Sequence, residues 1–501
     1  MKNLRYSVLM LVLPVFLLSC ADLDLENENE TDSSWIDSDP DALFDLAGIT
    51  FRTFHNQLQE YSGEALNMAA MADHLTCPWG FSRDLSMEPR VFSYNNSLNY
   101  AYYSYYLLPQ WAEIYSAISY SNFILQNIYN NLNSVELTEE EIDLLEAYCW
   151  FVSGVSHGYL GLIFDKALVI KYDSDLSNYT LRSWSEVIYE SLDMLDTAIG
   201  LAESGSFEVP GEWMGGKPMT GIELAQLARS YAARILVYSS RNKQQNLQLD
   251  WTRVLSYARD GIDYDFQPVL GDEYGFLDTY WTYATYPGWA RVDHRIINLM
   301  DHDYPSRWPR DGHSWTTPDG EDPGEADPVD ARLLTDFEYL ISQNFPPSRG
   351  YYYFSHYRFS RYDYLRDEAW YGIGPRPSFM AWELRLIEAE ALYRTGNSTG
   401  ALAILNDPMG PRKVRGMLPD ITLEDDILRY ILDEKEIECF CTGAGISFFD
   451  MRRTDRLQAG TLLHFPVPAT ELELMGLEHY TIHNFEDGIE GSAGGWTGWD
   501  E

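Results

Sequence analysis

After residue 40 the apolar positions of the chain recur mostly with the period of an α-helix. In the clearest segment they are three and four residues apart, which places them on one face of a long helix. These positions are Ile142, Leu145, Tyr148, Val152, Val155, Tyr159 and Leu162. The same spacing predicts helices over 184–201, 222–238, 251–262, 382–393 and 423–441.

Several predicted helices begin at a capping box, in which a Ser or Thr is followed three residues later by Glu. The three boxes are Thr138…Glu141, Ser183…Glu186 and Thr220…Glu223. Thr422…Asp425 is a weaker copy, and Gly396-Asn397 after Tyr393 is a typical helix end. Because one pair of helices cannot bury its own apolar face, such pairs are expected to stack on one another.

We therefore predict a mainly α fold, a tetratricopeptide-like superhelix of helical hairpins over residues 41–270 and 375–485. Residues 271–374 break the helical pattern and are rich in Trp, Tyr, Pro, Gly and Asp. Structureless segments of that length are uncommon unless they are functional. We interpret them as an irregular, aromatic-rich inserted subdomain, with short strands at 351–357.

The N-terminus has the features of an export signal. Lys2 and Arg5 precede an apolar run over residues 6–18 that is too short to span a bilayer, and Ser19-Cys20 follows directly. This arrangement resembles the lipobox of bacterial lipoproteins, which implies a signal peptide over 1–19 and acylation of Cys20. An ordinary signal peptide with an incidental Cys is the alternative.

Residues 20–40 contain no Lys or Arg and are predicted to form an acidic flexible tether. Acidic residues directly after the acylated Cys resemble the surface-export signal of Bacteroidetes lipoproteins, so we expect a lipid-anchored protein on the outer membrane that faces outward. The Gly/Trp-rich residues 486–501 form a second acidic tail.

The net charge of the chain excludes one class of function. The chain has 77 Asp and Glu against 35 Lys and Arg, a net charge of −42. Nucleic acids are bound through Lys and Arg, so we exclude nucleic-acid binding as the main role. No C-x-x-C motif is present, and whether Cys77, Cys149, Cys439 or Cys441 form a disulfide is left open.

Catalytic and metal motifs are weak. Residues 154–158 fit G-x-S-x-G, but they lie inside a predicted helix, whereas a nucleophile elbow needs a strand–turn–helix. Close packing of another helix on the two glycines explains the motif better. His479 and His483 as a metal pair, and the acidic run 318–323 as a Ca²⁺ site, are minor alternatives. No catalytic residue, metal or cofactor is predicted.

Aromatic rings on loops are the most informative feature. An exposed Trp or Tyr face matches the apolar C–H face of a sugar, and polar side chains match its hydroxyls. The alternative is that these rings form a small core for the insert. The candidate ligand-binding residues are Trp281, Tyr283, Tyr286, Trp289, Arg291 and Trp308 in the insert, with Asp73, Trp79, Phe81 and Arg83 from an earlier loop.

Five segments, in order, are similar to the SusD/RagB family of surface glycan-binding lipoproteins. Besides the start at Cys20, they are 221–238, 384–391, 434–443, 448–453 and 465–471. Phe164–Val169 and the tail from Glu490 depart from the family pattern. We interpret Asp450, Arg452 and Arg453 as structural ion-pair and capping residues rather than ligand contacts.

The resemblance implies a non-catalytic protein. It would bind an oligosaccharide at the cell surface and deliver it to a SusC-like TonB-dependent outer-membrane transporter. The family's sugar contacts come from variable loops, so the candidate residues above remain a prediction from the aromatic loops. The alternatives are a tetratricopeptide-like interaction scaffold without a sugar ligand and a secreted glycoside hydrolase with two carboxylates at the scissile bond.

Overall fold

The computed structural model describes most of the chain between Pro40 and Ile482. The described residues are 40–77, 82, 85, 90, 94–96, 108–131, 137–175, 177–307, 323–342, 345, 354–366 and 372–482. The predicted signal peptide, the acylation site Cys20, the tail 486–501 and residues 318–322 of the acidic run lie outside this set. Within it, no helix is long and apolar enough to cross a lipid bilayer.

The first part of the described chain is almost entirely helical. Its helices are α3 (Pro40–Leu58), α4 (Glu64–Met71), α6 (Leu108–Asn131), α7 (Glu139–Ile163), α8 (Trp184–Ser204), α9 (Gly221–Tyr238), α10 (Lys243–Leu247) and α11 (Trp251–Arg259). The three capping boxes are confirmed at the starts of α7, α8 and α9. In each box the hydroxyl accepts a backbone N–H and the Glu accepts one in return.

The C-terminal part is also helical. It contains α15 (Ala381–Arg394), α16 (Ser398–Leu405), α17 (Pro411–Val414), α18 (Ile427–Glu438), α19 (Ile446–Arg453) and α20 (Ala469–Leu474). Thr422 and Asp425 form only half of a capping box: the N–H and the hydroxyl of Thr422 donate to the Asp425 carboxylate, but the N–H of Asp425 donates to the Thr422 carbonyl and not to its hydroxyl. The helix expected there starts later. It begins at Ile427 because Asp426 accepts the N–H of Arg429 and acts as the N-cap.

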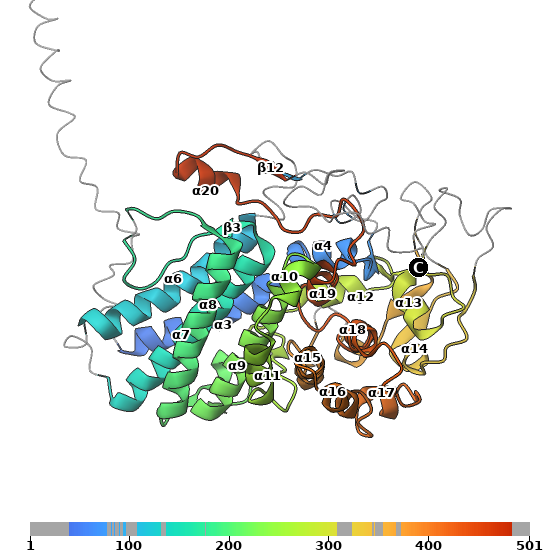
Figure 1. Cartoon of the computed structure of the whole chain (residues 1–501). Coiled ribbons are helices and arrows are strands. Elements are labelled where there is room, and N and C mark those ends of the chain that lie inside the picture. The colour runs from blue at the N-terminus through green and yellow to red at the C-terminus, as the bar shows by residue number, and fades with distance from the viewer. Residues whose placement is uncertain are drawn as a thin grey trace, which may run out of the picture.

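Helices that follow one another in the chain lie side by side, so the predicted mainly α, tetratricopeptide-like arrangement is confirmed. α7 packs on α6 and α8, α8 packs on α9, and α9 packs on α11 and α15 (Figure 1). α15 then packs on α16 and α18. The strands are only two or three residues long and form two-stranded ladders in the described ranges.

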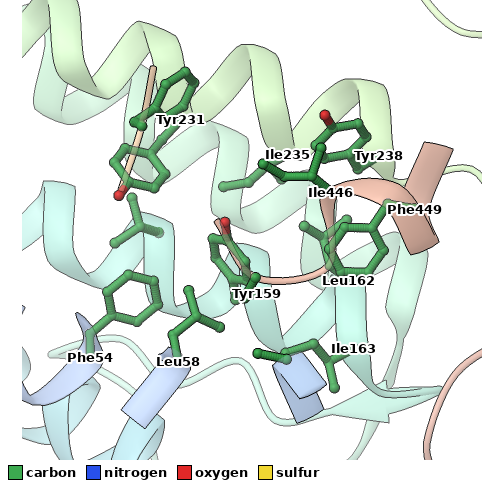
Figure 2. Close-up of a cluster of buried hydrophobic side chains, with 14 of the residues drawn as sticks. Phe54, Leu58, Tyr159, Leu162, Ile163, Tyr231, Ile235, Tyr238, Ile446 and Phe449 are labelled. Carbon is green, nitrogen blue, oxygen red and sulfur yellow. The ribbon is translucent and has the colours of Figure 1, made fainter. Parts of the chain in front are cut away.

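One hydrophobic core joins helices that are distant in sequence. Figure 2 shows side chains of α3 (Phe54, Leu58), α7 (Tyr159, Leu162, Ile163), α9 (Tyr231, Ile235, Tyr238) and α19 (Ile446, Phe449) gathered in one cluster. A second, smaller cluster lies between α15, α16 and α18. The C-terminal helices are therefore bound to the N-terminal ones through shared apolar burial.

The glycines of the G-x-S-x-G sequence lie at helix contacts, as the sequence analysis expected. A Cβ on Gly154 would lie 2.7 Å from Leu195 Cγ in α8, and one on Gly158 would lie 2.3 Å from Ile235 Cδ1 in α9. Ser156, between them, is fully buried in α7. The motif is explained by helix packing and not by a nucleophile.

The segment 271–374 is less irregular than expected. It contains α12 (Thr279–Thr285), α13 (His294–Met300), α14 (Arg332–Thr335), a 3₁₀ turn at Asp363–Leu365 and the strands β8 (Arg291–Val292), β9 (Phe337–Tyr339) and β10 (Tyr357–Phe359). β9 pairs with β10, which starts at the end of the predicted strand range; residues 351–353 lie outside the described set. Most of its buried apolar side chains, Phe276 and Tyr280 among them, belong to the main core cluster.

The remaining strands are β1 (Leu75–Thr76), β2 (Tyr94–Asn95), β3 (Lys166–Ala167), β4 (Arg182–Ser183), β5 (Glu208–Val209), β6 (Met219–Thr220), β7 (Val269–Leu270), β11 (Gly374–Pro375) and β12 (Thr481–Ile482). They pair antiparallel as β1–β8, β2–β12, β3–β4, β5–β6 and β7–β11. Ladders this short contribute local registration rather than a sheet.

The charged residues of α19 are structural, as the sequence analysis interpreted them. Arg453 pairs with Glu390 and with Asp450 at 2.5 Å each, and Lys435 donates to Asp450 at 3.0 Å. Arg452 donates to three backbone carbonyls. All five side chains are buried, so they tie α15, α18 and α19 together and do not face a ligand.

Candidate functional site: a surface row of stacked aromatic rings

The β1–β8 ladder brings two predicted aromatic loops to the same place. Thr76 pairs with Arg291, so the chain leading into the first loop runs beside the end of the second. Cys77 Sγ lies 3.9 Å from the hydroxyl of Tyr283. Of the candidates, Trp79, Phe81, Arg83 and Trp308 lie outside the described residues.

Four aromatic rings form a continuous row, which we call the aromatic ladder: Tyr61, Tyr283, Trp289 and Tyr286. Tyr61 and Tyr283 stack with centroids 5.3 Å apart and planes 8° from parallel. Tyr283 stacks on Trp289 at 4.7 Å, and Trp289 contacts Tyr286 at 4.9 Å with tilted planes. Tyr61 is 45% exposed and Tyr286 is 37% exposed, so the ladder reaches the surface at both ends.

The start of α12 holds the first half of the ladder. Asp278 accepts the N–H of Trp281 and so caps the helix that carries Tyr283. The N–H of Tyr61 donates to the hydroxyl of Thr279 at 2.9 Å. The loop after α3 is thus bound to α12 by hydrogen bonds, which explains why the rings of Tyr61 and Tyr283 stack.

A buried arginine holds the second half. The N–H of Trp289 donates to the carbonyl of Tyr286 in a turn, and Arg291 donates to the carbonyls of Pro287 and Ala290. Burial lowers the pKa of Arg291 to about 10, a value at which the group still carries its charge at neutral pH. Arg291 was a candidate ligand contact; because it is fully buried, its role here is to shape the turn.

Trp281 does not belong to the exposed surface. Its side chain is 1% exposed, and the guanidinium groups of Arg366 and Arg376 lie 4.8 Å and 5.1 Å from its ring. A Cβ on Gly372 would lie 2.6 Å from Trp281 Cζ3. The ring is therefore enclosed by cation–π and van der Waals contacts, and for this residue the core alternative holds.

Asp73 is likewise buried. Its carboxylate accepts from Arg90 at 2.6 Å and from Gln458 at 2.7 Å, and it is 1% exposed. Burial and the charge of Asp73 raise the pKa of neighbouring Asp293 to about 7. Asp293 accepts from Thr76 and from the N–H of Arg295 at the start of α13. Both carboxylates thus belong to the framework below the loops.

The ladder can offer ring faces and adjacent oxygens to a ligand. Tyr283 stacks with Tyr61 and Trp289, so its faces are occupied, and the two most exposed rings, Tyr61 and Tyr286, carry the available surface. Glu60 lies next to Tyr61 and accepts from Thr279 at 2.9 Å. Tyr61 could not be predicted from the sequence, because nothing in its own segment distinguishes it; only the contact with α12 does.

No cluster of three or more His, Cys, Asp or Glu residues suited to a metal ion occurs in the part of the chain that the structure describes. His479 lies 3.1 Å from Glu473, and His483, its proposed partner, is outside that part. Cys149, Cys439 and Cys441 are buried thiols. Burial raises the pKa of the Cys441 thiol to about 12, so it is not ionised at neutral pH.

Comparison with known proteins places the fold. No protein-family model matches the sequence, and no curated protein matches it. A SusD superfamily protein from Bacteroides vulgatus matches with a TM-score of 0.57 at 15% identity, covering 87% of this chain and 97% of that one. A SusD superfamily protein from Parabacteroides distasonis gives 0.59 at 14% identity, covering 88% and 98%.

A third solved structure, a SusD-like carbohydrate binding protein from Bacteroides fragilis, has a TM-score of 0.57 at 14% identity and covers 83% of this chain and 86% of its own. These matches cover 86% to 98% of the other chains. The chain therefore has the fold of the SusD superfamily.

Proposed function

We propose that this protein is a non-catalytic, cell-surface glycan-binding protein of the SusD/RagB type. It binds an oligosaccharide and delivers it to a SusC-like TonB-dependent transporter. Acylated Cys20 anchors it to the outer membrane, facing outward. The fold supports this proposal, and one of the solved structures that share it is named as a carbohydrate binding protein.

The aromatic ladder is the observation that carries the proposal. Tyr61 and Tyr286 present ring faces to solvent at the ends of a row that Tyr283 and Trp289 hold in place. A sugar stacks its C–H face on such a ring, and a neighbouring carboxylate such as Glu60 accepts its hydroxyls. Because the rings are already packed on one another, little side-chain entropy is lost on binding.

Affinity electrophoresis of the full-length protein through gels that contain a panel of plant and microbial polysaccharides tests the site. We expect at least one polysaccharide to retard the protein. Tyr61→Ala combined with Tyr286→Ala should weaken that retention about tenfold or more, since a stacked aromatic contact contributes about 1 kcal/mol beyond its buried area. Tyr189→Ala, which removes a 66% exposed ring on α8, is the matched control and should leave retention unchanged.

The two alternatives give different results in the same experiments. Release of reducing ends from any retained polysaccharide would indicate a glycoside hydrolase. Absence of retention on the whole panel would favour an interaction scaffold. Co-purification of a large outer-membrane receptor with the tagged protein would support the transporter partner, and its absence from the purified complex would contradict that part of the proposal.

A further inference from the structure

A groove lies between α13 and α18 and shares no residue with the aromatic ladder. Its volume is about 740 Å³, and α10 and the residues after α19 complete its walls. Among the described residues that line it are five basic ones, Lys243, Arg295, Arg394, Arg429 and Arg456, and two acidic ones, Asp426 and Asp455. The chain as a whole has 77 acidic and 35 basic residues, so a groove lined by more basic than acidic side chains stands out on this protein.

Two of the basic groups have carboxylate partners of their own: Arg295 pairs with Glu436 at 3.1 Å and Arg394 with Glu390 at 3.2 Å. The other three are only partly neutralised by ion pairs. Arg429 and Arg456 share a single carboxylate, Asp433, at 3.3 Å each, which leaves one of their two positive charges uncompensated. Arg429 contacts Asp433 through Nε and is 63% exposed, so its terminal nitrogens face solvent. Lys243 is exposed, and its ammonium forms no ion pair among the described residues.

A buried arginine forms part of the wall of the groove. Arg295 is 5% exposed and lines the groove; its Nε and Nη2 donate to Asp73 O, Ala72 O, Glu436 and Ser447. Its Nη1 has no hydrogen-bond partner in the part of the chain that the structure describes. This nitrogen is shielded from solvent and the guanidinium is paired with Glu436 at 3.1 Å, so Arg295 contributes a fixed positive group to the wall of the groove and not an open donor.

Apolar surface lies beside these charges. Leu299 of α13 and Leu428 and Leu432 of α18 also line the groove. Guanidinium groups hydrogen-bond carboxylate or sulfate oxygens two at a time, and the leucines offer contact area for the C–H groups of a sugar ring. The combination fits a saccharide that carries acidic groups better than a small inorganic ion, which would leave the leucines uncovered.

We propose that the groove between α13 and α18 binds an acidic oligosaccharide, a segment whose sugars carry carboxylate or sulfate groups. This inference rests on the proposed glycan-binding function and adds a second binding contact, which distinguishes charged from uncharged sugars. The aromatic ladder then binds the apolar faces of sugars whether or not they are charged. The groove selects for acidic chains, which the net charge of −42 on the protein would otherwise repel.

Binding of polygalacturonate, dextran sulfate and uncharged dextran to the full-length protein at low ionic strength tests the proposal. The variant Lys243→Gln/Arg429→Gln removes two exposed groove charges without touching the buried ion pairs. We expect it to weaken binding of at least one acidic polymer about tenfold or more, with a smaller difference at high salt. The matched control Arg182→Gln/Lys217→Gln removes two exposed charges from other elements and should change neither. The two acidic polymers separate carboxylate from sulfate recognition.

Equal binding of acidic and uncharged polymers, or unchanged acidic binding in Lys243→Gln/Arg429→Gln, would overturn the inference. A Tyr61→Ala/Tyr286→Ala variant shows whether the groove inference or the proposed function has failed. If uncharged glycans are bound through the ladder but acidic ones are not preferred, the groove proposal fails alone. If acidic polymers bind through the groove and ladder variants change nothing, the ladder proposal fails and the groove stands.

Discussion

Replacing Gly158 of α7 by Ala tests the packing of the helical superhelix directly. The new Cβ would lie 2.3 Å from Ile235 Cδ1 in α9 and 2.8 Å from the hydroxyl of Ser191 in α8. Both neighbours are fully buried, and Ser191 donates to the carbonyl of Gly154 at 2.7 Å, so neither can move freely. Ala at this position must therefore shift Ile235 or Ser191 away from its packed position.

The magnitude follows from two opposed effects. Overpacking a buried site costs about 1–3 kcal/mol, and contact with two buried side chains at once places Gly158→Ala at about 3 kcal/mol. Ala in place of Gly in a helix gains about 1 kcal/mol. We therefore expect the free energy of unfolding to fall by about 2 kcal/mol.

Gly200→Ala is the matched control, because Gly200 lies in α8 and a Cβ there would meet no atom within 4 Å. The helix-propensity gain should then appear alone, as a stabilisation of up to about 1 kcal/mol. Urea unfolding followed by far-ultraviolet circular dichroism measures both variants. If Gly158→Ala were as stable as the parent while Gly200→Ala behaved as expected, close helix packing would not explain the G-x-S-x-G sequence.

Three further outcomes are expected. Arg453→Met leaves the carboxylate of Glu390 buried without its main partner, so the free energy of unfolding should fall by about 3–5 kcal/mol in denaturant titrations; adding Glu390→Gln should recover part of the loss, and no recovery would contradict the pairing. Burial raises the pKa of Glu64 from 4.5 to about 8, so stability should fall as pH rises between these values; Glu64→Gln should flatten the fall, by at most about 4 kcal/mol at pH 8, and an unchanged pH profile would refute the assignment. Cys20→Ala should release the protein from the membrane fraction, and continued sedimentation with membranes would contradict acylation.

The helices and their starts could be predicted because their signals are local. The boxes at Thr138, Ser183 and Thr220 need only a hydroxyl and a Glu three residues later, and the structure confirms all three. At Thr422 the same pattern predicts a start that lies too early, because Thr422 and Asp426 are both suited to cap the helix and in the structure Asp426 does so. Which of them succeeds depends on where α18 packs, and the pattern does not contain that information.

The candidate site was predictable only as a region. The segment between Trp281 and Trp289 does carry three rings of the ladder, but its first part is the helix α12 and not a loop, and Trp281 is enclosed by Arg366 and Arg376 from a later segment. Tyr61, an exposed end of the ladder, reaches the loop through a hydrogen bond to Thr279, 218 residues away. Neither the enclosure of Trp281 nor the contact of Tyr61 with α12 can be inferred from the residues next to them in the sequence.

The amino-acid sequence by itself determined several of the long helices, among them α7, α8, α9, α11 and α15, and the capping boxes at which three of them start. These depend on side-chain periodicity and on hydrogen bonds within one turn of helix. Only the tertiary structure decided which aromatic rings face solvent and which basic residues share a groove. Exposure and charge compensation depend on neighbours brought together from distant parts of the chain. For this reason Trp281 is buried in the core, whereas Trp289 stacks on Tyr283 in the aromatic ladder.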